Sequence, residues 1–305
     1  MNQATASRTA LGVALMRAIH TRADPSPLLD DAWGDCLVPQ SAKDEILDRA
    51  LAALERQGIV SGTLSHEKML DLFLRGSPAY ATVVTRSRYA EDVLLRAIEN
   101  GATQYVLVGA GFDSFALRRT PAYRDVNLFE IDLPATQQLK LSRFSECGIP
   151  LPEKVSYAPA DFSRANLTEV LSCTDYKKSE RSVLSWLGVA MYLRDETNRL
   201  ALTDIANCAC SGSELVFTYL DRRVFEDDNT AGAARFREQQ AVVTALGEPF
   251  LSGFRPESLR DELRDLGFDL TEDLSDEQVL KRYDPTGKNG LQPLPFSRIA
   301  HARVI

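Results

Sequence analysis

The chain has 305 residues, of which 44% are hydrophobic and 26% charged, the proportions of an ordinary soluble globular protein with a large core. The formal net charge of −8, without any basic block, argues against a nucleic-acid backbone as the main ligand. The sequence has no run of about 18 apolar residues, so we expect no membrane-spanning helix. Arg17 interrupts the apolar stretch Leu11–Ile19 and no small-residue cleavage site follows, so we expect no signal peptide.

The cysteines are odd in number and scattered. Cys208-x-Cys210 has no second pair at metal-ligand spacing, so we expect neither a zinc site nor any other metal. We therefore expect all five, Cys36, Cys147, Cys173, Cys208 and Cys210, to be reduced thiols of a cytoplasmic protein.

The first hundred residues are predicted to be entirely helical. Apolar residues recur at helical spacing in Thr9–Arg22, Lys43–Gln57 and His66–Leu74. A longer helix follows, from Ser77-Pro78 to Asn100-Gly101. We expect residues 1–100 to form a cap or lid over a site; simple packing against the sheet is the alternative.

A strand followed by a glycine turn lies at the centre of the chain. Tyr105–Val108 is a short apolar run typical of a parallel strand buried on both faces. It stops at Gly109-Ala110-Gly111, where glycine allows a tight turn and close approach of a ligand. A second strand, Asn127–Asp132, ends in Glu130 and Asp132, about twenty residues beyond the turn. This spacing predicts a site for the adenosine half of a cofactor, with one of the two acids on its ribose.

The residues of the turn distinguish between cofactors. A dinucleotide turn normally has Gly or Ala where this chain has Ser114, and Asp113 would repel a pyrophosphate. The same carboxylate would attract an ammonium or sulfonium group. We therefore expect S-adenosylmethionine; a nicotinamide oxidoreductase is the competing hypothesis.

The remaining strands predict a doubly wound sheet. Three further strands alternate with helices, and a final pair suggests an antiparallel edge strand. The predicted strands are Lys154–Tyr157, Ser182–Leu187, Gly212–Leu220, Phe268–Leu274 and Arg298–Ile305. We thus expect an α/β Rossmann-like core over residues 101–305, with a helical insert at about 222–250, forming one compact unit with the cap.

Other polar residues are candidates for cofactor contacts. Asp161-Phe162, after the third strand, could bind an adenine through its amine and its ring face, although Asp161 could instead be a helix N-cap. Arg86 or Arg88, before the first strand, could bind the cofactor carboxylate, although an arginine on a helix is usually just solvated.

Several motifs resemble one family across nearly the whole chain. They include TRSRY at Thr85–Tyr89, VLVGAGFDSFALR, FEIDLPATQQLK, PADF, SWLGVAMYL and SELVFTYL. Together these motifs are similar to the bacterial S-adenosylmethionine-dependent O-methyltransferases related to the leucine carboxyl methyltransferases.

The resemblance implies roles for particular residues. It implies that Gly109, Asp132, Asp161 and Phe162, with Arg86 or Arg88, bind the cofactor, and that Asp132 rather than Glu130 binds the ribose. One position departs from the family: leucine carboxyl methyltransferases have a cofactor-contacting acid where this chain has Leu187. The departure points away from a protein-leucine substrate and towards a natural-product-like small molecule, free or carried on a carrier or peptide.

The sequence offers no obvious catalytic base, and this bears on which group of the acceptor is methylated. A carboxylate is ionised near neutral pH and needs no base, whereas a hydroxyl does. Of the three histidines, His66 and His301 are expected to be structural, and His20 could face the pocket. No base stands out, which favours a carboxylate acceptor over a hydroxyl. Tyr192 is the candidate for orienting the acceptor, with packing under the cap as the alternative; a non-catalytic cofactor-binding protein is the third hypothesis.

Overall fold

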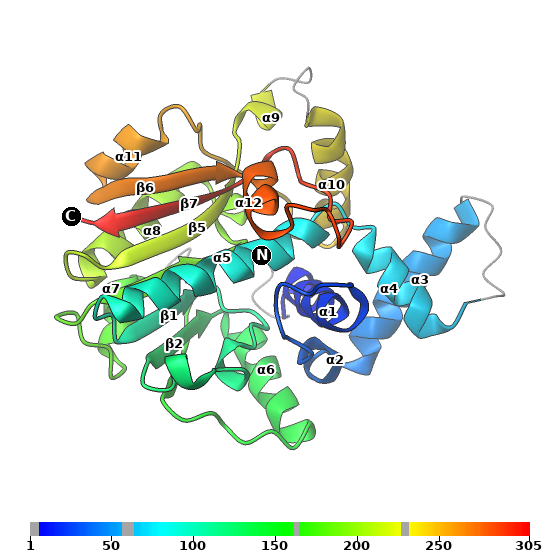
Figure 1. Ribbon diagram of the computed structural model, residues 1–305, viewed down its shortest axis with the longest axis horizontal. Coiled ribbons are helices and arrows are strands. Elements are labelled where there is room, and N and C mark those ends of the chain that lie inside the picture. The colour runs from blue at the N-terminus through cyan, green and yellow to red at the C-terminus, as the bar shows by residue number, and fades with distance from the viewer. Residues whose placement is uncertain (1–5, 57–63, 162–164, 227–231) are drawn as a thin grey trace.

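The computed structural model describes residues 6–56, 64–161, 165–226 and 232–305. Their strands form one sheet in the order β3-β2-β1-β4-β5-β7-β6 (Figure 1). The strands are β1 Gln104–Val108, β2 Asn127–Asp132, β3 Val155–Pro159, β4 Ser182–Trp186, β5 Glu214–Leu220, β6 Phe268–Ser275 and β7 Ser297–Val304. β1 to β5 are parallel, and β7 is antiparallel to both of its neighbours. The final pair thus forms the antiparallel edge of the sheet, with β6 outermost and β7 beside β5.

Helices cover both faces of the sheet, which is why β1 is a continuous apolar run. Val106 and Val108 face one core, and Tyr105 and Leu107 face the other. The first core is closed by α7 (Leu167–Ser172), α8 (Asp195–Cys208) and α11 (Leu259–Asp265), and the second by α5 (Tyr80–Glu99) and α12 (Asp276–Tyr283). α6 (Pro134–Glu146) follows β2, and single 3-10 turns occupy Phe115–Leu117, Pro121–Tyr123 and Ala190–Tyr192.

The N-terminal helices form a separate layer beside the sheet (Figure 1). They are α1 (Arg8–Ala23), α2 (Gly34–Leu37), α3 (Gln40–Arg56) and α4 (His66–Arg75). Their core also takes in the start of α5, Phe112 after the glycine turn and Phe144 of α6. α5 itself lies on the sheet, although it falls within the predicted cap region 1–100. The predicted insert contributes α9 (Arg223–Glu226) and α10 (Ala233–Ala245).

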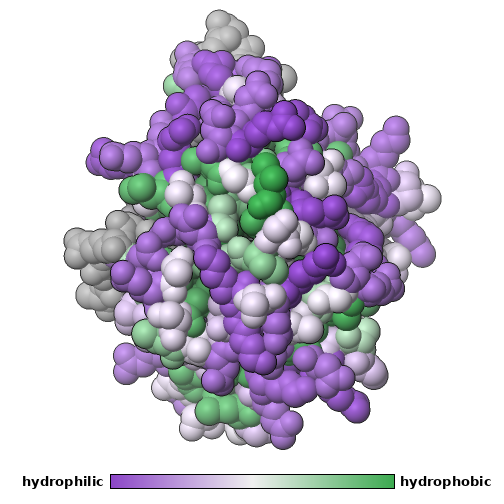
Figure 2. Space-filling model, turned by 90° about the vertical axis from the view of Figure 1, so that its left-hand side faces the viewer, coloured by the Kyte–Doolittle hydropathy of each residue, from purple (hydrophilic) through white to green (hydrophobic). Residues whose placement is uncertain are grey.

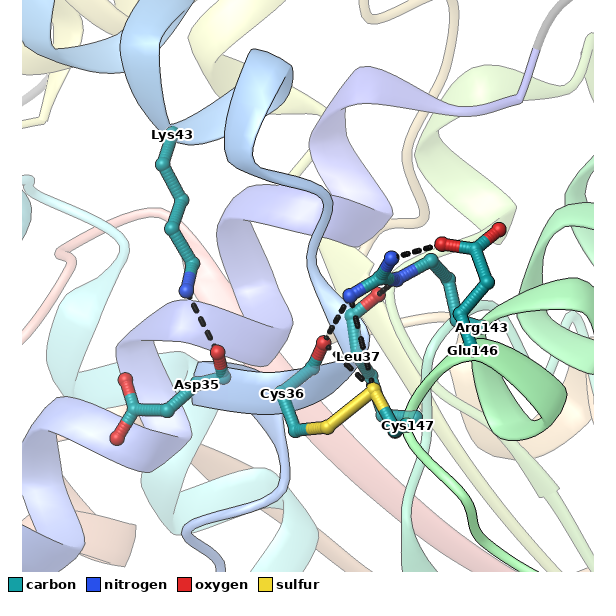
Figure 3. The surroundings of a disulfide bond; sticks show 7 residues. All are labelled: Asp35, Cys36, Leu37, Lys43, Arg143, Glu146 and Cys147. Atoms are coloured by element: carbon teal, nitrogen blue, oxygen red, sulfur yellow. Dashed lines mark hydrogen bonds and ion pairs between the residues drawn. A yellow bond between two sulfur atoms is a disulfide. The ribbon is translucent and has the colours of Figure 1, made fainter.

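A disulfide joins the cap to the core, which corrects the expectation of five free thiols. Cys36 in α2 is bonded to Cys147, at the end of α6, 111 residues later (Figure 3). Arg143 reinforces the contact by donating to the carbonyl oxygens of Cys36 and Leu37 at 2.6 and 3.2 Å. Packing of α2 against α6 brings together two cysteines whose sequence separation gives no sign of pairing. Because disulfides persist mainly in oxidising compartments, cysteine usage no longer supports a cytoplasmic location.

The face of the molecule remote from the cap is mostly hydrophilic. Figure 2 shows apolar side chains there only in small separated patches. Within the described residues, no helix combines the length and the apolar character needed to cross a membrane.

Candidate functional site

The glycine turn is folded back onto the end of β2. The backbone N–H groups of Gly109 and Ala110 both donate to the Ile131 carbonyl, at 2.8 and 3.0 Å. Gly109 has a φ of +74°, and a Cβ at this position would lie 2.4 Å from Cγ2 of Val189. Position 109 is therefore restricted to glycine by both its backbone conformation and the space around it.

Of the two acids that end β2, only Asp132 faces the cavity at the turn. Its two oxygens accept from the backbone N–H groups of Gly111 (2.5 Å) and Leu133 (2.6 Å). Burial raises the pKa of Asp132, and these two hydrogen bonds oppose that rise. Each carboxylate oxygen keeps acceptor capacity for a hydroxyl group. Glu130 is instead fully buried in an ion pair with Lys140 at 2.5 Å, so the structure separates the two acids that spacing alone could not.

The cap helix α1 braces the turn through a buried arginine. Arg17 donates to Asp31 at 2.7 Å and to the carbonyl oxygen of Phe112 at 2.7 Å. Asp31 is fully buried and also pairs with Arg118 at 3.6 Å. Burial alone would raise the pKa of Asp31, but the charges of Arg17 and Arg118 hold it below its ordinary value. Residues of the cap thereby fix the position of the glycine turn.

Of the two candidate arginines in α5, Arg86 lines the cavity. Its guanidinium lies against Gly188, where an added Cβ would come within 2.6 Å of an Arg86 nitrogen. Burial lowers the pKa of Arg86 to about 10, so it remains a cation near neutral pH. Arg88 is exposed, pairs with Asp92 at 3.0 Å and donates to the Leu28 carbonyl, away from the cavity.

Other predicted residues lie at the same place. Asp113, Asp161 and Leu187 all line this cavity. Asp161 does not cap the following helix, because Asn166 is the N-cap of α7. Phe162 lies outside the described residues. Leu187 places an apolar side chain on the cavity wall at the position where leucine carboxyl methyltransferases have an acid.

Tyr192 lies at the inner wall of the cavity beside the cap. Burial raises its pKa to about 12, and the nearby carboxylate of Glu248 adds to the rise. The Thr9 side chain is close enough to lower that pKa, although within the described residues Thr9 Oγ1 is buried without a hydrogen bond of normal geometry. Glu248 accepts from the Thr9 backbone N–H at 3.3 Å. Tyr192 also packs against Phe250, which follows α10, with ring centroids 5.5 Å apart. The role of Tyr192 in orienting the acceptor stays a prediction.

The histidines lie elsewhere. His20 is fully buried, at 2.5 Å from Asp24 through Nδ1, while Nε2 accepts from the Leu28 N–H at 2.7 Å. His301 in β7 pairs with Glu214 at 2.6 Å. Neither residue, nor His66, lines the cavity at the turn or the neighbouring one described next.

Two cavities meet beneath the cap. The first, about 130 Å³, is the one at the glycine turn. The second, about 550 Å³, lies between the cap helices and α10. They share Thr9 and Val13 of α1.

The first cavity has the groups that S-adenosylmethionine requires. The glycine turn would allow close approach of the cofactor, the Asp132 carboxylate would offer acceptors to its ribose hydroxyls, and the Arg86 cation would suit its carboxylate. Asp113, in the turn, places a negative charge where a sulfonium or ammonium group is favoured. When bound, the cofactor supplies an activated methyl group.

Comparisons with known proteins identify the family. The fold and the cofactor cavity define an S-adenosylmethionine-dependent methyltransferase, and a family model described as leucine carboxyl methyltransferase matches residues 10–206. The chain belongs to the leucine carboxyl methyltransferase family, which confirms the resemblance.

Individual relatives support the same assignment. A Bacillus subtilis protein named "Putative S-adenosyl-L-methionine-dependent methyltransferase YktD" is 27% identical over 310 residues, covering 99% of each chain. A Mycolicibacterium smegmatis protein of the same description is 28% identical over 86% of this chain and 83% of its own. A solved Streptomyces avermitilis structure of the duf574 family shares the fold, with a TM-score of 0.56 and 15% identity over 85% of this chain and 96% of that one. The predicted fold class and cofactor are thus confirmed.

Two residues of the site were not predicted as such. Arg17 is a charged residue in an otherwise apolar helical stretch of the sequence. Such a residue is rarely buried unless it has an ion-pair or hydrogen-bond partner, so the pattern indicates a buried polar contact. Nothing in the sequence indicates that Thr9 belongs to the site, because only the packing of α1 places this residue between the two cavities.

Proposed function

We propose that this methyltransferase acts on the carboxylate of a small-molecule acceptor and forms a methyl ester. The supporting observation is the composition of the two cavities. Among the described residues that line them, there is no histidine, and the acids are Asp113, Asp132 and Asp161, all on the cofactor side. A carboxylate acceptor needs no base, whereas a hydroxyl acceptor does.

The reaction balances without a proton acceptor. An acceptor oxygen bonds to the methyl carbon while the sulfur keeps the electron pair of the bond that breaks. A carboxylate becomes a neutral ester, and no proton is transferred. The contribution of the chain is alignment of the reacting atoms and exclusion of water.

Tyr192 is proposed to orient the acceptor. Its phenol lines the cofactor cavity close to Thr9, where that cavity meets the second one. With its pKa raised to about 12, Tyr192 stays protonated near neutral pH and can donate a hydrogen bond to a carboxylate oxygen. It is therefore suited to holding an oxyanion and unsuited to removing a proton.

Methylation of a hydroxyl group is the second candidate, because Glu248 is buried close to Tyr192. A carboxylate there could receive a proton through the phenol. Against this candidate, Glu248 lines neither cavity and already accepts from the Thr9 backbone.

The stability of the product distinguishes the two candidates. The protein would be incubated with methyl-labelled S-adenosylmethionine and a panel of matched apolar carboxylic acids and phenols. Mild alkali hydrolyses a methyl ester and releases labelled methanol, whereas a methyl ether survives. Base-labile label on acids is the expected result. Base-stable label, confined to phenols, would refute carboxyl methylation.

A further inference from the structure

The second cavity differs from the first in size and in the character of its walls. It has a volume of about 550 Å³, within the range of sites that hold a drug-sized ligand. Its walls come from α1, α3, α4, the segment leading into α5, and α10, and are mostly aliphatic. The apolar members include Met16, Ile46, Met69, Phe73, Val83 and Val243.

Some of the walls are apolar groups that reach the solvent. Leu64, Leu72 and Val242 are 43%, 48% and 51% exposed, and all three line this cavity. Large exposed apolar side chains gathered around one opening are typical of a ligand-binding groove.

The charged residues on the walls all have the same sign. Of the described residues that line this cavity, only Arg8 and Arg49 are charged. Arg8 pairs with Glu45 at 3.5 Å, and Arg49 donates to the Glu45 backbone carbonyl at 3.3 Å. Burial, and then the charge of Arg8, lower the pKa of Arg49, while Glu45 opposes both. Glu45 offsets one of the two cations, so this apolar wall keeps a net positive charge, which favours an anionic ligand.

The two cavities adjoin at the first two turns of α1, where Thr9 and Val13 line both. Within the described residues the buried Thr9 hydroxyl, beside the Tyr192 phenol, lacks a hydrogen bond of normal geometry. A buried hydroxyl in that state has capacity for a ligand oxygen. A ligand with its polar end at Thr9 would reach the cofactor cavity while its apolar body stayed in the second one.

We infer that the second cavity is the acceptor site and that it selects apolar monocarboxylic acids. This inference rests on the proposed carboxyl methylation. The carboxylate lies at Thr9, close to Tyr192, and the hydrocarbon body packs between the cap and α10. Arg8 and Arg49 favour the anionic acid over its neutral ester, so the product binds less tightly than the substrate.

Gly12 provides the test. It lines the second cavity but not the first, its φ lies outside the left-handed region, and a Cβ added there would meet nothing within 4 Å. Gly12→Phe should therefore fill the cavity without disturbing the backbone, and Gly12→Ala is the matched control. Ala53→Phe fills the same space from α3 and serves as a second variant.

Calorimetry would measure binding of dodecanoic acid, its methyl ester and, separately, S-adenosylhomocysteine. We expect Gly12→Phe and Ala53→Phe to bind the acid at least tenfold more weakly, with unchanged cofactor affinity and Gly12→Ala within about threefold of the parent. We also expect Arg8→Gln combined with Arg49→Gln to weaken binding of the acid and not of the ester.

Failure of this inference is distinguishable from failure of the proposed function. Wild-type-like binding of the acid by both filled variants would overturn the acceptor site, as would no binding of the acid by the parent protein. Base-labile label on acids, measured as above, would in either case leave carboxyl methylation standing. Base-stable label on phenols would overturn the reaction, whatever the variants bind.

Discussion

Arg17 in the cap and Asp31 in the loop after α1 form a buried ion pair at 2.7 Å, and the same guanidinium holds the Phe112 carbonyl of the cofactor turn. Both side chains are at most 4% exposed. The pair therefore links the fold of the cap to the shape of the cofactor site. Its loss should affect both stability and cofactor binding.

Asp31→Asn should lower the free energy of unfolding by about 3–5 kcal/mol, the cost of leaving a buried charge without its partner. Because the pKa of Asp31 is held below its ordinary value, its contribution is present above that value and is lost as the pH falls through the folded pKa. Urea denaturation at neutral and acidic pH would measure this, with cofactor titration alongside. Asp30→Asn, at the exposed neighbouring residue, is the control and should change little. If Asp31→Asn and Asp30→Asn changed the free energy of unfolding and the cofactor affinity equally, the buried ion pair would not support the glycine turn.

Asp132→Ala should weaken cofactor binding by about 1–3 kcal/mol, the range for losing hydrogen bonds to a charged group. Glu130→Gln should leave cofactor affinity unchanged and lower stability instead, because Glu130 pairs with Lys140 inside the core. Calorimetric titration with S-adenosylhomocysteine and thermal unfolding would compare the two variants. Unchanged affinity in Asp132→Ala would remove Asp132 from the ribose site.

Gly109→Val should abolish cofactor binding, because its Cβ would meet Val189 at 2.4 Å and the turn would have to move. Gly148→Val is the matched control: Gly148 has a similar φ of +66°, but a Cβ there meets nothing within 4 Å. Backbone strain is thus common to both variants, and only Gly109→Val distorts the cavity. If both variants bound the cofactor equally well, the turn would not be part of the site.

Elements with a strong local pattern could be predicted from the sequence. The strand predicted at Asn127–Asp132 has those bounds in the structure, and the β1–turn–β2 unit lies where its glycines and acids indicated. α12 was not predicted, although Ser275 and Gln278 form a capping box that the sequence displays.

Features that depend on packing could not be predicted in this way. Cys36 and Cys147 are 111 residues apart, and only the contact of α2 with α6 brings them together. Helical spacing predicted α1, but not that Thr9 would separate two cavities or that Arg17 would reach the turn. The second cavity is formed by side chains from five segments, and none of these segments carries a motif.

Removing the disulfide should destabilise the protein. Cys36→Ser combined with Cys147→Ser should lower the free energy of unfolding by about 2–4 kcal/mol, because the bond constrains a long loop in the unfolded chain. Cys173→Ser, at an exposed free thiol, is the control. Thiol titration of the denatured, unreduced protein checks the pairing directly: Cys173, Cys208 and Cys210 should react, three thiols in all. Five reactive thiols would show that the bond does not form.

The pH dependence of stability should carry a contribution from Asp276 at the start of α12. Burial raises its pKa to about 6, although the Leu294 N–H, the Thr82 hydroxyl and the charge of Arg86 oppose the rise. A raised folded pKa means that this contribution is fully present below the unfolded value near 4 and is lost as the pH rises through about 6.

Asp276→Asn resembles the protonated acid, since an amide oxygen in the place of Oδ2 can still accept from the Leu294 N–H and the Thr82 hydroxyl. A shift of about two pKa units corresponds to roughly 3 kcal/mol. The variant should therefore gain up to that amount relative to the parent between pH 4.5 and pH 7.5, as measured by urea denaturation across that range. Asp269→Asn, at an exposed carboxylate, should show no such gain and controls for net charge. A stability difference between Asp276→Asn and the parent that stayed constant with pH would contradict the raised pKa of this buried carboxyl.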